Sequence, residues 1–334
     1  MTRRARILLL ALFGCVALAV GCFYYATAMP GSSKSGALPP LTPLEVSVAQ
    51  DVRRHVEKLS VDIGPRRAVE GDSLKRAEAY LQGELAALGQ GKLRREPIPN
   101  APGDPANLVL DLPGKQPGPW IVLGAHYDTA PGGTRGANDN GSGTAAALVL
   151  GKRLASSSHA LPIRVVLFAN EEMPYFQTDA MGSLVHARGC RERGEELRGM
   201  FSLETMGYFS DEPASQKYPK PLDRAYPDRG NFIAFVADVS SRSLLRDSLE
   251  RFRKHATIPS EGGALPSTLP GIGWSDHWAF WQQGYQAVMV TDTALFRDPT
   301  YHRTSDLAGN LDFERLARVV VGLEKVVLEL ASAP

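Results

Sequence analysis

Cysteine is scarce in this chain. Of three cysteines in 334 residues, Cys15 and Cys22 lie in the N-terminal apolar run, which leaves Cys190 as the one thiol of the remaining sequence. A single thiol cannot form an internal disulfide, and it excludes a structural zinc site made of four thiolates or of two thiolates and two imidazoles. Any metal in the folded part must therefore be held by histidine and carboxylate side chains, the ligands typical of catalytic sites.

An excess of charge of one sign is also missing. Lys+Arg number 37 against 36 for Asp+Glu, so the formal net charge is +1. Nucleic-acid-binding proteins need a basic face to displace counterions from phosphates, and the near balance argues against a nucleic-acid partner. The hydrophobic fraction of 43% and the charged fraction of 22% predict a packed globular core and not a disordered chain.

The N-terminus is basic and then strongly apolar. Three arginines within the first six residues precede an unbroken apolar stretch from Ile7 to about Met29. At a rise of about 1.5 Å per residue, such a stretch is long enough to cross a hydrocarbon core of about 30 Å. Positive charge before the stretch predicts the N-terminus in the cytoplasm and the remainder outside. We therefore expect residues 1–30 to be a signal anchor or a signal peptide. The protein would be exported, either membrane-anchored with its folded part outside the cytoplasm or secreted.

Two other details of this segment stay open in the sequence. Residues 26–28 (ATA) form a small-x-small cleavage site, and residues 19–22 (AVGC) are a weak lipoprotein site in which Cys22 would take the lipid.

Residues 31–42 (GSSKSGALPPLT) combine Gly, Ser and Pro without periodicity, so they are predicted to be a linker. We expect the folded, catalytic domain to cover residues 43–334.

Helical and strand signals alternate over the predicted domain. Helical patterns cover 46–59, 73–88, 142–155, 181–193, 241–255 and 313–330. Apolar or alternating runs predict strands at 106–112, 120–125, 163–168, 200–203, 232–236 and 287–291. Strands that alternate with helices predict an α/β fold, a three-layer sandwich with a mostly parallel central sheet flanked by helices. Two Pro- and Gly-bearing stretches, about 209–230 and 257–275, are too long for ordinary connections and are candidate active-site loops.

Ionisable side chains gather where the predicted strands end. In open α/β sheets, ligands bind outside the carboxyl ends of the strands. The candidates are His126 and Asp128 after 120–125, Asp139 in the Gly-rich loop that follows, Glu171 and Glu172 after 163–168, Glu204 after 200–203, and His302 after the last strand. These side chains are therefore expected to form one site at the carboxyl edge of the sheet.

Several of these residues also suit simpler structural roles. Asp139 also suits the N-cap of the predicted helix at 142–155. Glu171 and Glu172 would otherwise be a solvated surface pair, but two acids directly after an apolar strand repel each other unless a cation is present. Asp128 is close enough in sequence to accept a proton from the second ring nitrogen of His126, a pairing that orients the imidazole in many zinc sites.

Together the candidates match a two-metal centre. One histidine and two carboxylates on each metal, with one carboxylate shared, hold a co-catalytic pair about 3.5–4 Å apart. The first ion would be bound by His126 and Glu204, the second by His302 and Glu172, and Asp139 would bridge both. Nitrogen and oxygen ligands without thiolate favour zinc, although manganese and cobalt also fit.

Glu171 stands beside a ligand without being one, and it is the expected general base. It would take a proton from a metal-bridged water and pass it to the leaving amine. The metals would lower the pKa of that water and polarise the scissile carbonyl. Asp128 would support catalysis from behind His126.

These residues resemble the M28 family of zinc aminopeptidases and carboxypeptidases over about residues 45–330. The matching segments are 124–128, 136–143, 170–172 with 181–183, Glu204, 275–277, and 301–302 with Asp306, preceded by 63–66 and 107–109. The resemblance implies a zinc exopeptidase-like fold, two Zn²⁺ ions per chain, and a peptide or amino-acid-derivative substrate that is hydrolysed at one chain terminus.

The sequence departs from the family pattern in two places. The family usually has only a couple of residues between the Glu pair and the following Gly-Ser, whereas residues 173–180 (MPYFQTDA) extend this connection. We expect the extension to reshape the wall beside the general base. Glu204 stands where the aminopeptidases carry Asp and some relatives carry Glu, which leaves the direction of exopeptidase cleavage open.

An aminopeptidase is the expected enzyme, with a carboxypeptidase as the alternative. Recognition of a free α-amino group needs an acidic rim, which Glu171, Glu204 or Asp211 would supply. A carboxypeptidase needs a cationic clamp for the terminal carboxylate, and Arg297 or Arg303 near His302 would supply it.

Two further functions are compatible with the same scaffold. Glutaminyl cyclase is an acyltransferase of similar fold that uses one zinc, and the intact pairing of His126 with Asp139 favours two metals. A non-catalytic, receptor-like ectodomain would be expected to lose ligands or the base, and this chain keeps all of them.

Overall fold

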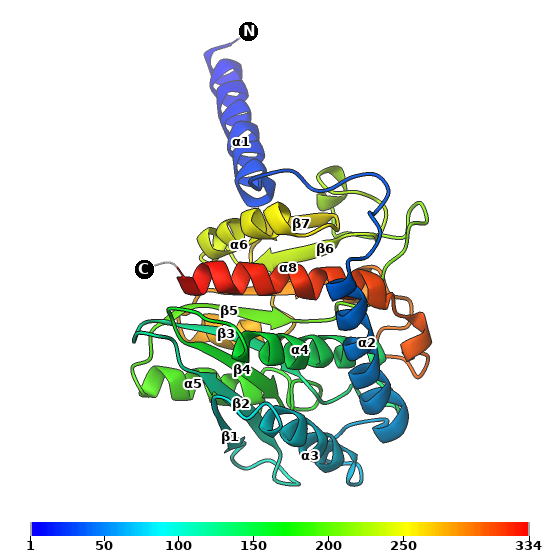
Figure 1. Cartoon of the computed structure of the whole chain (residues 1–334). Helices are drawn as coiled ribbons and strands as arrows, with labels where there is room; N and C mark the ends of the chain where they lie inside the picture. Colours follow the sequence, from blue (N-terminus) through cyan, green and yellow to red (C-terminus); the bar gives the residue numbers. More distant parts are fainter. Residues whose placement is uncertain (1, 333–334) are drawn as a thin grey trace.

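An eight-stranded mixed sheet forms the middle layer of the computed structural model, which describes residues 2–332 (Figure 1). In chain order the strands are β1 Lys92–Pro97, β2 Ala106–Leu112, β3 Trp120–His126, β4 Ile163–Phe168, β5 Leu197–Leu203, β6 Ile233–Ala237, β7 Ser260–Ala264 and β8 Ala287–Thr291. Their order across the sheet is β1-β2-β4-β3-β5-β8-β6-β7. The four central strands β4, β3, β5 and β8 are parallel neighbours, while β1, β2 and β6 join by antiparallel pairing. The predicted α/β sandwich is confirmed: its central strands are parallel, and β7 also pairs in parallel with β6 at one edge of the sheet.

Helices cover both faces of this sheet. These helices are α2 Pro43–Glu57, α3 Ser73–Ala86, α4 Gly143–Ala155, α5 Gly182–Glu192, α6 Arg242–His255, α7 His277–Gln282 and α8 Phe313–Ser332, while α1 Arg3–Thr27 lies outside the layers. Helices α2, α3, α4, α6 and α8 share one apolar core with the sheet, and α5 and α7 share a second core on the opposite face. The central strands are buried on both sides, which explains why they read as continuous apolar runs.

The sequence patterns missed three elements. β1 (KLRREP) is charged because it is an edge strand, and β7 (SEGGA) lacks the β-branched and aromatic residues that mark strands. The prediction of a loop over 257–275 is therefore wrong over Ser260–Ala264, where β7 pairs with β6. Helix α7 has only six residues, too few to show a helical period.

The N-terminal helix α1 projects away from the rest of the molecule in Figure 1. It has no buried residues, and it is the one helix of residues 2–332 that is long and apolar enough to cross a membrane. Its C-terminal end packs on the domain through Phe23 and Ala26, and the guanidinium of Arg242 lies over the Tyr25 ring. Residues 31–42 contain no helix or strand within the described chain, and α2 begins at Pro43 behind a capping box formed by Thr42 and Glu45.

Candidate metal centre

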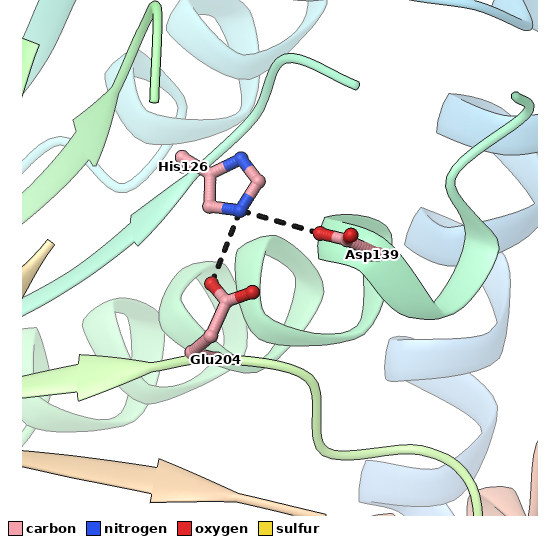
Figure 2. Close-up of side chains that lie close together, drawn as sticks. All are labelled: His126, Asp139 and Glu204. Atoms are coloured by element: carbon pink, nitrogen blue, oxygen red, sulfur yellow. Dashed lines mark ion pairs between the residues drawn. The ribbon is translucent and has the colours of Figure 1, made fainter. Parts of the chain in front are cut away.

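His126 is the last residue of β3, at the carboxyl edge of the sheet. Its side chain is fully buried, and neither ring nitrogen has a hydrogen-bond partner in the described part of the chain. Nε2 lies 3.4 Å from Asp139 Oδ1 and 3.1 Å from Glu204 Oε2. Figure 2 shows Asp139 and Glu204 pointing toward this nitrogen from two different segments. The structure thus brings together the three residues predicted to hold the first ion.

Asp139 lies in the segment Ala137–Ser142 before α4, at a point where the backbone is not helical. The Asp306 carboxylate accepts hydrogen bonds from the backbone N–H groups of Asn138 and Asp139, at 2.8 and 3.0 Å. Within residues 2–332, neither side-chain oxygen of Asp139 has a hydrogen-bond partner. The alternative role of Asp139 as a helix cap is wrong, because Asn140 Oδ1 accepts the N–H of Gly143 at the start of α4. The Asp139 carboxylate is therefore available to the neighbouring imidazoles.

Glu171 and Glu172 follow β4 and are held through their backbone. Asp128 Oδ1 accepts the N–H of Glu171 at 3.1 Å, and Oδ2 accepts that of Glu172 at 3.0 Å. The same Oδ1 lies 3.3 Å from His126 Nδ1. One buried carboxylate therefore fixes the ends of β3 and β4 relative to each other, a role that the spacing of Asp128 in the sequence did not show.

His302 approaches from the loop after β8. Its Nε2 lies 3.0 Å from Asp139 Oδ2 and 3.3 Å from Glu172 Oε1. The imidazole stacks on the Tyr301 ring, with 3.9 Å between ring centroids. The His302 side chain is 42% exposed, so this half of the cluster opens to solvent while the half around His126 is buried.

The residues form two groups that share Asp139. The groups are His126, Asp139 and Glu204, and Asp139, Glu172 and His302, with the ligand atoms of each group within 4.8 Å of one another. Tetrahedral zinc with nitrogen and oxygen ligands at about 2.0–2.2 Å separates neighbouring ligand atoms by about 3.3–3.6 Å. The histidine–carboxylate distances of 3.0 to 3.4 Å are close to this spacing. Glu171 Oε2 lies 3.8 Å from His126 Nε2 and belongs to neither group.

The charge of the cluster is strongly unbalanced. Burial and the neighbouring Asp139 raise the pKa of Glu172 to about 7, and burial raises the pKa of Glu204. Burial opposes a charge on His302, but the adjacent carboxylates of Asp139 and Glu172 outweigh it and raise the pKa of His302 to about 10. All three shifts arise because several buried carboxylates lie close together with little positive charge nearby. Divalent cations fit these residues, because they would satisfy the unpartnered ligand atoms and remove the need for the extra protons.

A fully buried arginine, Arg66, holds the loop between His126 and Asp139. Its guanidinium donates hydrogen bonds to five backbone carbonyls, those of Leu59, Gly64, Tyr127, Arg135 and Gly136. Burial lowers the pKa of Arg66 to about 10, although Asp306 and Asp128 act against that shift. The sequence placed Arg66 in a matching segment, but its contacts span up to 70 residues and could not be read from local spacing.

Glu204 is oriented by two residues that had no predicted role of their own. Asn140 Nδ2 and Ser275 Oγ each donate a hydrogen bond to Glu204 Oε2, both at 3.0 Å. This is the same oxygen that lies near His126. Asn140 and Ser275 are both fully buried. Because a buried polar side chain needs a hydrogen-bond partner, burial marks them as supporting residues once the fold is known.

An apolar pocket of about 100 Å³ opens beside the cluster, and its lining includes Glu204 of the cluster and Tyr301, whose ring stacks on His302. Its other walls come from the two predicted active-site loops and from β6 and β8. They include Tyr218, Leu222, Tyr226, Ala234, Leu265, Ile272, Met289 and Phe296. Most of the lining is aliphatic or aromatic, and Glu261 adds a second carboxylate besides Glu204.

Three other candidates lie outside both groups of possible ligands. Asp211 accepts hydrogen bonds from Asn231 and Arg315 at the surface. Arg297 is buried, and its guanidinium donates to Gln216 and to backbone carbonyls. Arg303 is exposed.

An α/β sandwich that gathers imidazoles and carboxylates at the ends of its parallel strands defines a class of metal-dependent hydrolases. Comparison with known families then identifies the family. The model of peptidase family M28 matches residues 107–327. The uncharacterized protein YfbL of Escherichia coli (strain K12) is 35% identical over 292 residues, which cover 85% of this chain and 88% of YfbL. The chain therefore belongs to peptidase family M28 and is a zinc-dependent hydrolase, a metallo-exopeptidase.

More distant relatives share part of their length or only the fold. A probable leucine aminopeptidase of Arthroderma otae is 27% identical over 68% of this chain, which spans 57% of that protein. The structure of BSAP, a zinc aminopeptidase from Bacillus subtilis, superposes with a TM-score of 0.67 at 16% identity and covers 88% of this chain and 97% of its own. Glutaminyl cyclases are also among the solved structures with this fold, so the fold alone does not distinguish the two chemistries.

Proposed function

We propose that this chain is a two-zinc aminopeptidase that removes an N-terminal residue with a large apolar side chain. The observation that carries the proposal is the pair of histidine–carboxylate groups that share Asp139 beside an apolar pocket. His126 and Glu204 would hold one ion, His302 and Glu172 the other, and Asp139 both.

Zinc bound in this cluster would supply a water of lowered pKa and polarise the scissile carbonyl. Glu171 is the general base in this proposal, because its buried carboxylate lies beside His126 without joining either group of ligands. It takes a proton from the attacking water and delivers it to the leaving amine. Asp128 keeps Glu171 in place through the backbone hydrogen bond that it accepts.

The surroundings of the cluster favour binding of an amino terminus. Buried carboxylates outnumber buried cations here, so an ammonium group of the substrate is attracted and a carboxylate beside Glu204 is repelled. The two arginines considered for a carboxypeptidase clamp do not line the apolar pocket beside the cluster: Arg297 is buried and donates from Nε and Nη1 to Gln216 and to backbone carbonyls, and Arg303 is exposed. The apolar pocket that includes Glu204 then takes the side chain of the first residue.

A glutaminyl cyclase or a non-catalytic ectodomain is less well supported. The second group, formed with His302 and Glu172, has the same spacing as the first and would be superfluous in an enzyme with one zinc. A non-catalytic receptor does not require a complete set of five metal ligands with a buried general base beside them.

We also propose that residues 1–30 anchor the catalytic domain, residues 43–334, to a membrane on its outer side. The apolar helix α1 supports this, as does its docking on α6, where Arg246 donates to the carbonyl of Ala28. Release of the protein by carbonate washing of membranes would contradict retention of the helix.

The catalytic proposal is tested with leucine anilide and N-acetyl-leucine anilide, together with zinc analysis of the purified protein. We expect about two zinc ions per chain and hydrolysis of the unblocked substrate only. Glu171→Gln should keep its zinc and lose at least about 100-fold in kcat. Glu192→Gln, which changes an exposed glutamate of α5, is the matched control and should behave as wild type. Absence of zinc, full activity of Glu171→Gln, or equal hydrolysis of the blocked anilide would overturn the proposal.

A further inference from the structure

The C-terminal end of helix α1 packs against the wall of the apolar pocket. Its Phe23 and Ala26 side chains pack on a cluster of three buried residues, Leu222, Leu265 and Ile272. All three line the pocket, whereas Phe23 and Ala26 do not line it themselves and therefore lie behind the wall. In Figure 1 this end of α1 lies over β7, which forms another part of the same wall. The helix that is apolar enough to cross a membrane thus meets the domain at the proposed substrate pocket.

Three arginines of α6 hold the chain where α1 ends. They donate hydrogen bonds to backbone carbonyls: Arg242 to that of Tyr25, Arg246 to that of Ala28, and Arg253 to that of Pro30. Spacings of four and seven residues place the three guanidinium groups on one face of α6. The last carbonyls of a helix have no partner within it, and cationic side chains there also stabilise the negative end of its dipole. The end of α1 is therefore fixed to the domain.

The chain just beyond α1 also covers the edge strand β7. Ser33 Oγ accepts the N–H of Ser260 at 3.0 Å, and Arg253 Nη2 donates to the Ser260 carbonyl at 2.7 Å. A Cβ atom placed at Gly262 would lie 3.4 Å from Met29 Cγ, so Met29 packs on this strand. An edge strand leaves part of its N–H and C=O groups unpaired, and Ser33 takes one of them here. Because Gly262 and its neighbours in β7 line the pocket, the same contacts also support the pocket wall.

The wall receives little support from the rest of the molecule. Its three buried residues form a small cluster of their own, separate from both apolar cores that hold the sheet. They come from loops, and the one regular element within 209–230 and 265–272 is the three-residue turn Leu222–Arg224. Segments with few buried apolar contacts open locally at a low cost in free energy. Phe23 and Ala26 therefore supply part of the limited packing that keeps the wall in one shape.

We propose that Phe23 and Ala26 position the wall of the apolar pocket, so that the retained membrane helix determines how tightly a large apolar N-terminal side chain is bound. This inference rests on the proposed aminopeptidase function and makes one property of it, the side-chain preference, depend on the anchor. Phe23 is a positioning residue, since it acts through the wall and does not line the space that the substrate occupies. A chain cut after the ATA site at residues 26–28 loses both side chains, and with them part of its preference for large residues.

The kinetic test compares leucine anilide with alanine anilide, using the full zinc-loaded chain in lipid nanodiscs. Phe23→Ala should lower kcat/KM for leucine anilide about 10-fold through a higher KM, because the displaced wall binds the large side chain poorly. Alanine anilide needs little of the pocket and should change less than about twofold. Phe23→Leu keeps a large apolar side chain and should restore most of the loss. Phe13→Ala is the matched control, because Phe13 is 73% exposed on the same helix, and it should leave both substrates unchanged.

Hydrogen exchange separates this inference from the proposed chemistry, because it needs no substrate. In Phe23→Ala the amides of residues 218–226 and 265–272 should exchange at least about fivefold faster than in wild type, while those of β3 and β5 stay unchanged. Phe13→Ala should match wild type in all of these segments. The inference is overturned if the wall exchanges equally fast in Phe23→Ala and wild type, or if Phe23→Ala slows the hydrolysis of both anilides equally. Failure of wild type to hydrolyse either anilide would refute the proposed function, while the exchange comparison would still decide whether α1 positions the wall.

Discussion

At the scale of single residues, two buried aspartates hold the candidate ligands in the same way. Asp128 accepts the backbone N–H groups of Glu171 and Glu172, and Asp306 accepts those of Asn138 and Asp139. Each aspartate thus fixes a pair of consecutive residues whose second member has its side chain in the cluster. Hydrogen bonds of this kind orient ligands before a metal binds and so reduce the cost of ordering them.

The role of Asp306 leads to a prediction about metal affinity. In Asp306→Asn one side-chain atom becomes an N–H donor that faces a backbone N–H, so the backbone at Asp139 must shift. We expect zinc affinity to fall about 10- to 100-fold, with a matching loss of activity at limiting zinc. Competition with a chromophoric chelator measures the affinity. Asp211→Asn, at the surface, is the control, and unchanged affinity in Asp306→Asn would contradict the role.

Four of the five ligand candidates could be predicted from the sequence because they stand just after a strand or in a Gly-rich loop, whereas His302 lies further along the loop that follows β8. His126, Glu172 and Glu204 follow apolar runs by at most four residues. The supporting residues could not be predicted in the same way. Asp306 reaches Asn138 across 168 residues, and Ser275 reaches Glu204 across 71. Such contacts depend on where the chain returns in three dimensions, which local spacing does not encode.

At the scale of elements, the parallel strands in the centre of the sheet were the most predictable part. They are buried on both faces and read as unbroken apolar runs, whereas the edge strands β1 and β7 are polar or Gly-rich. The stretch predicted as a loop over 209–230 contributes Tyr218, Leu222 and Tyr226 to the apolar pocket. Its function follows from its position over the ends of β6 and β8, a position that its sequence does not specify.

The pocket leads to a prediction about side-chain preference. Ala234 of β6 lines the pocket, and Ala234→Leu would fill part of its volume. We expect kcat/KM for leucine anilide to fall about 10-fold or more, since each methylene misfitted in an apolar pocket costs about that much. Alanine anilide needs less room and serves as the internal control, with a change of less than about threefold. A parallel loss on both substrates would show that the variant damages the enzyme and not the pocket.

At the scale of the whole molecule, the fold buries more carboxylates around the site than its own cations can neutralise. The rest of the sheet and two apolar cores hold the cluster rigid, while Asp276 and Asp306 add further buried carboxylates around it. Burial raises the pKa of Asp276 and that of Asp306 to about 7. Without cations the folded state therefore takes up protons that the unfolded chain does not.

The sign of the resulting pH dependence follows from these shifts. Glu172 has a folded pKa of about 7 against a usual value of 4.5, so the stabilisation from its proton is complete below about pH 4.5 and is lost as the pH rises through 7. His302 has a folded pKa of about 10 against 6.5, so its contribution is complete below pH 6.5 and is lost as the pH rises toward 10. The metal-free protein should therefore become less stable between about pH 5 and pH 9.

Zinc should reverse this trend. It binds the same side-chain atoms as these protons, and fewer protons compete for those atoms at high pH. We expect the rise in Tm caused by zinc to be larger at pH 8 than at pH 5.5. At saturating zinc the gain should be several degrees, since a ligand at about 1,000 times its Kd adds about 4 kcal/mol to the free energy of unfolding. Calorimetry of zinc-loaded and chelator-treated protein at both pH values measures it. His302→Ala, which keeps the buried group around His126, should retain only part of the increment. Equal increments at the two pH values would show that zinc does not bind where the protons are held.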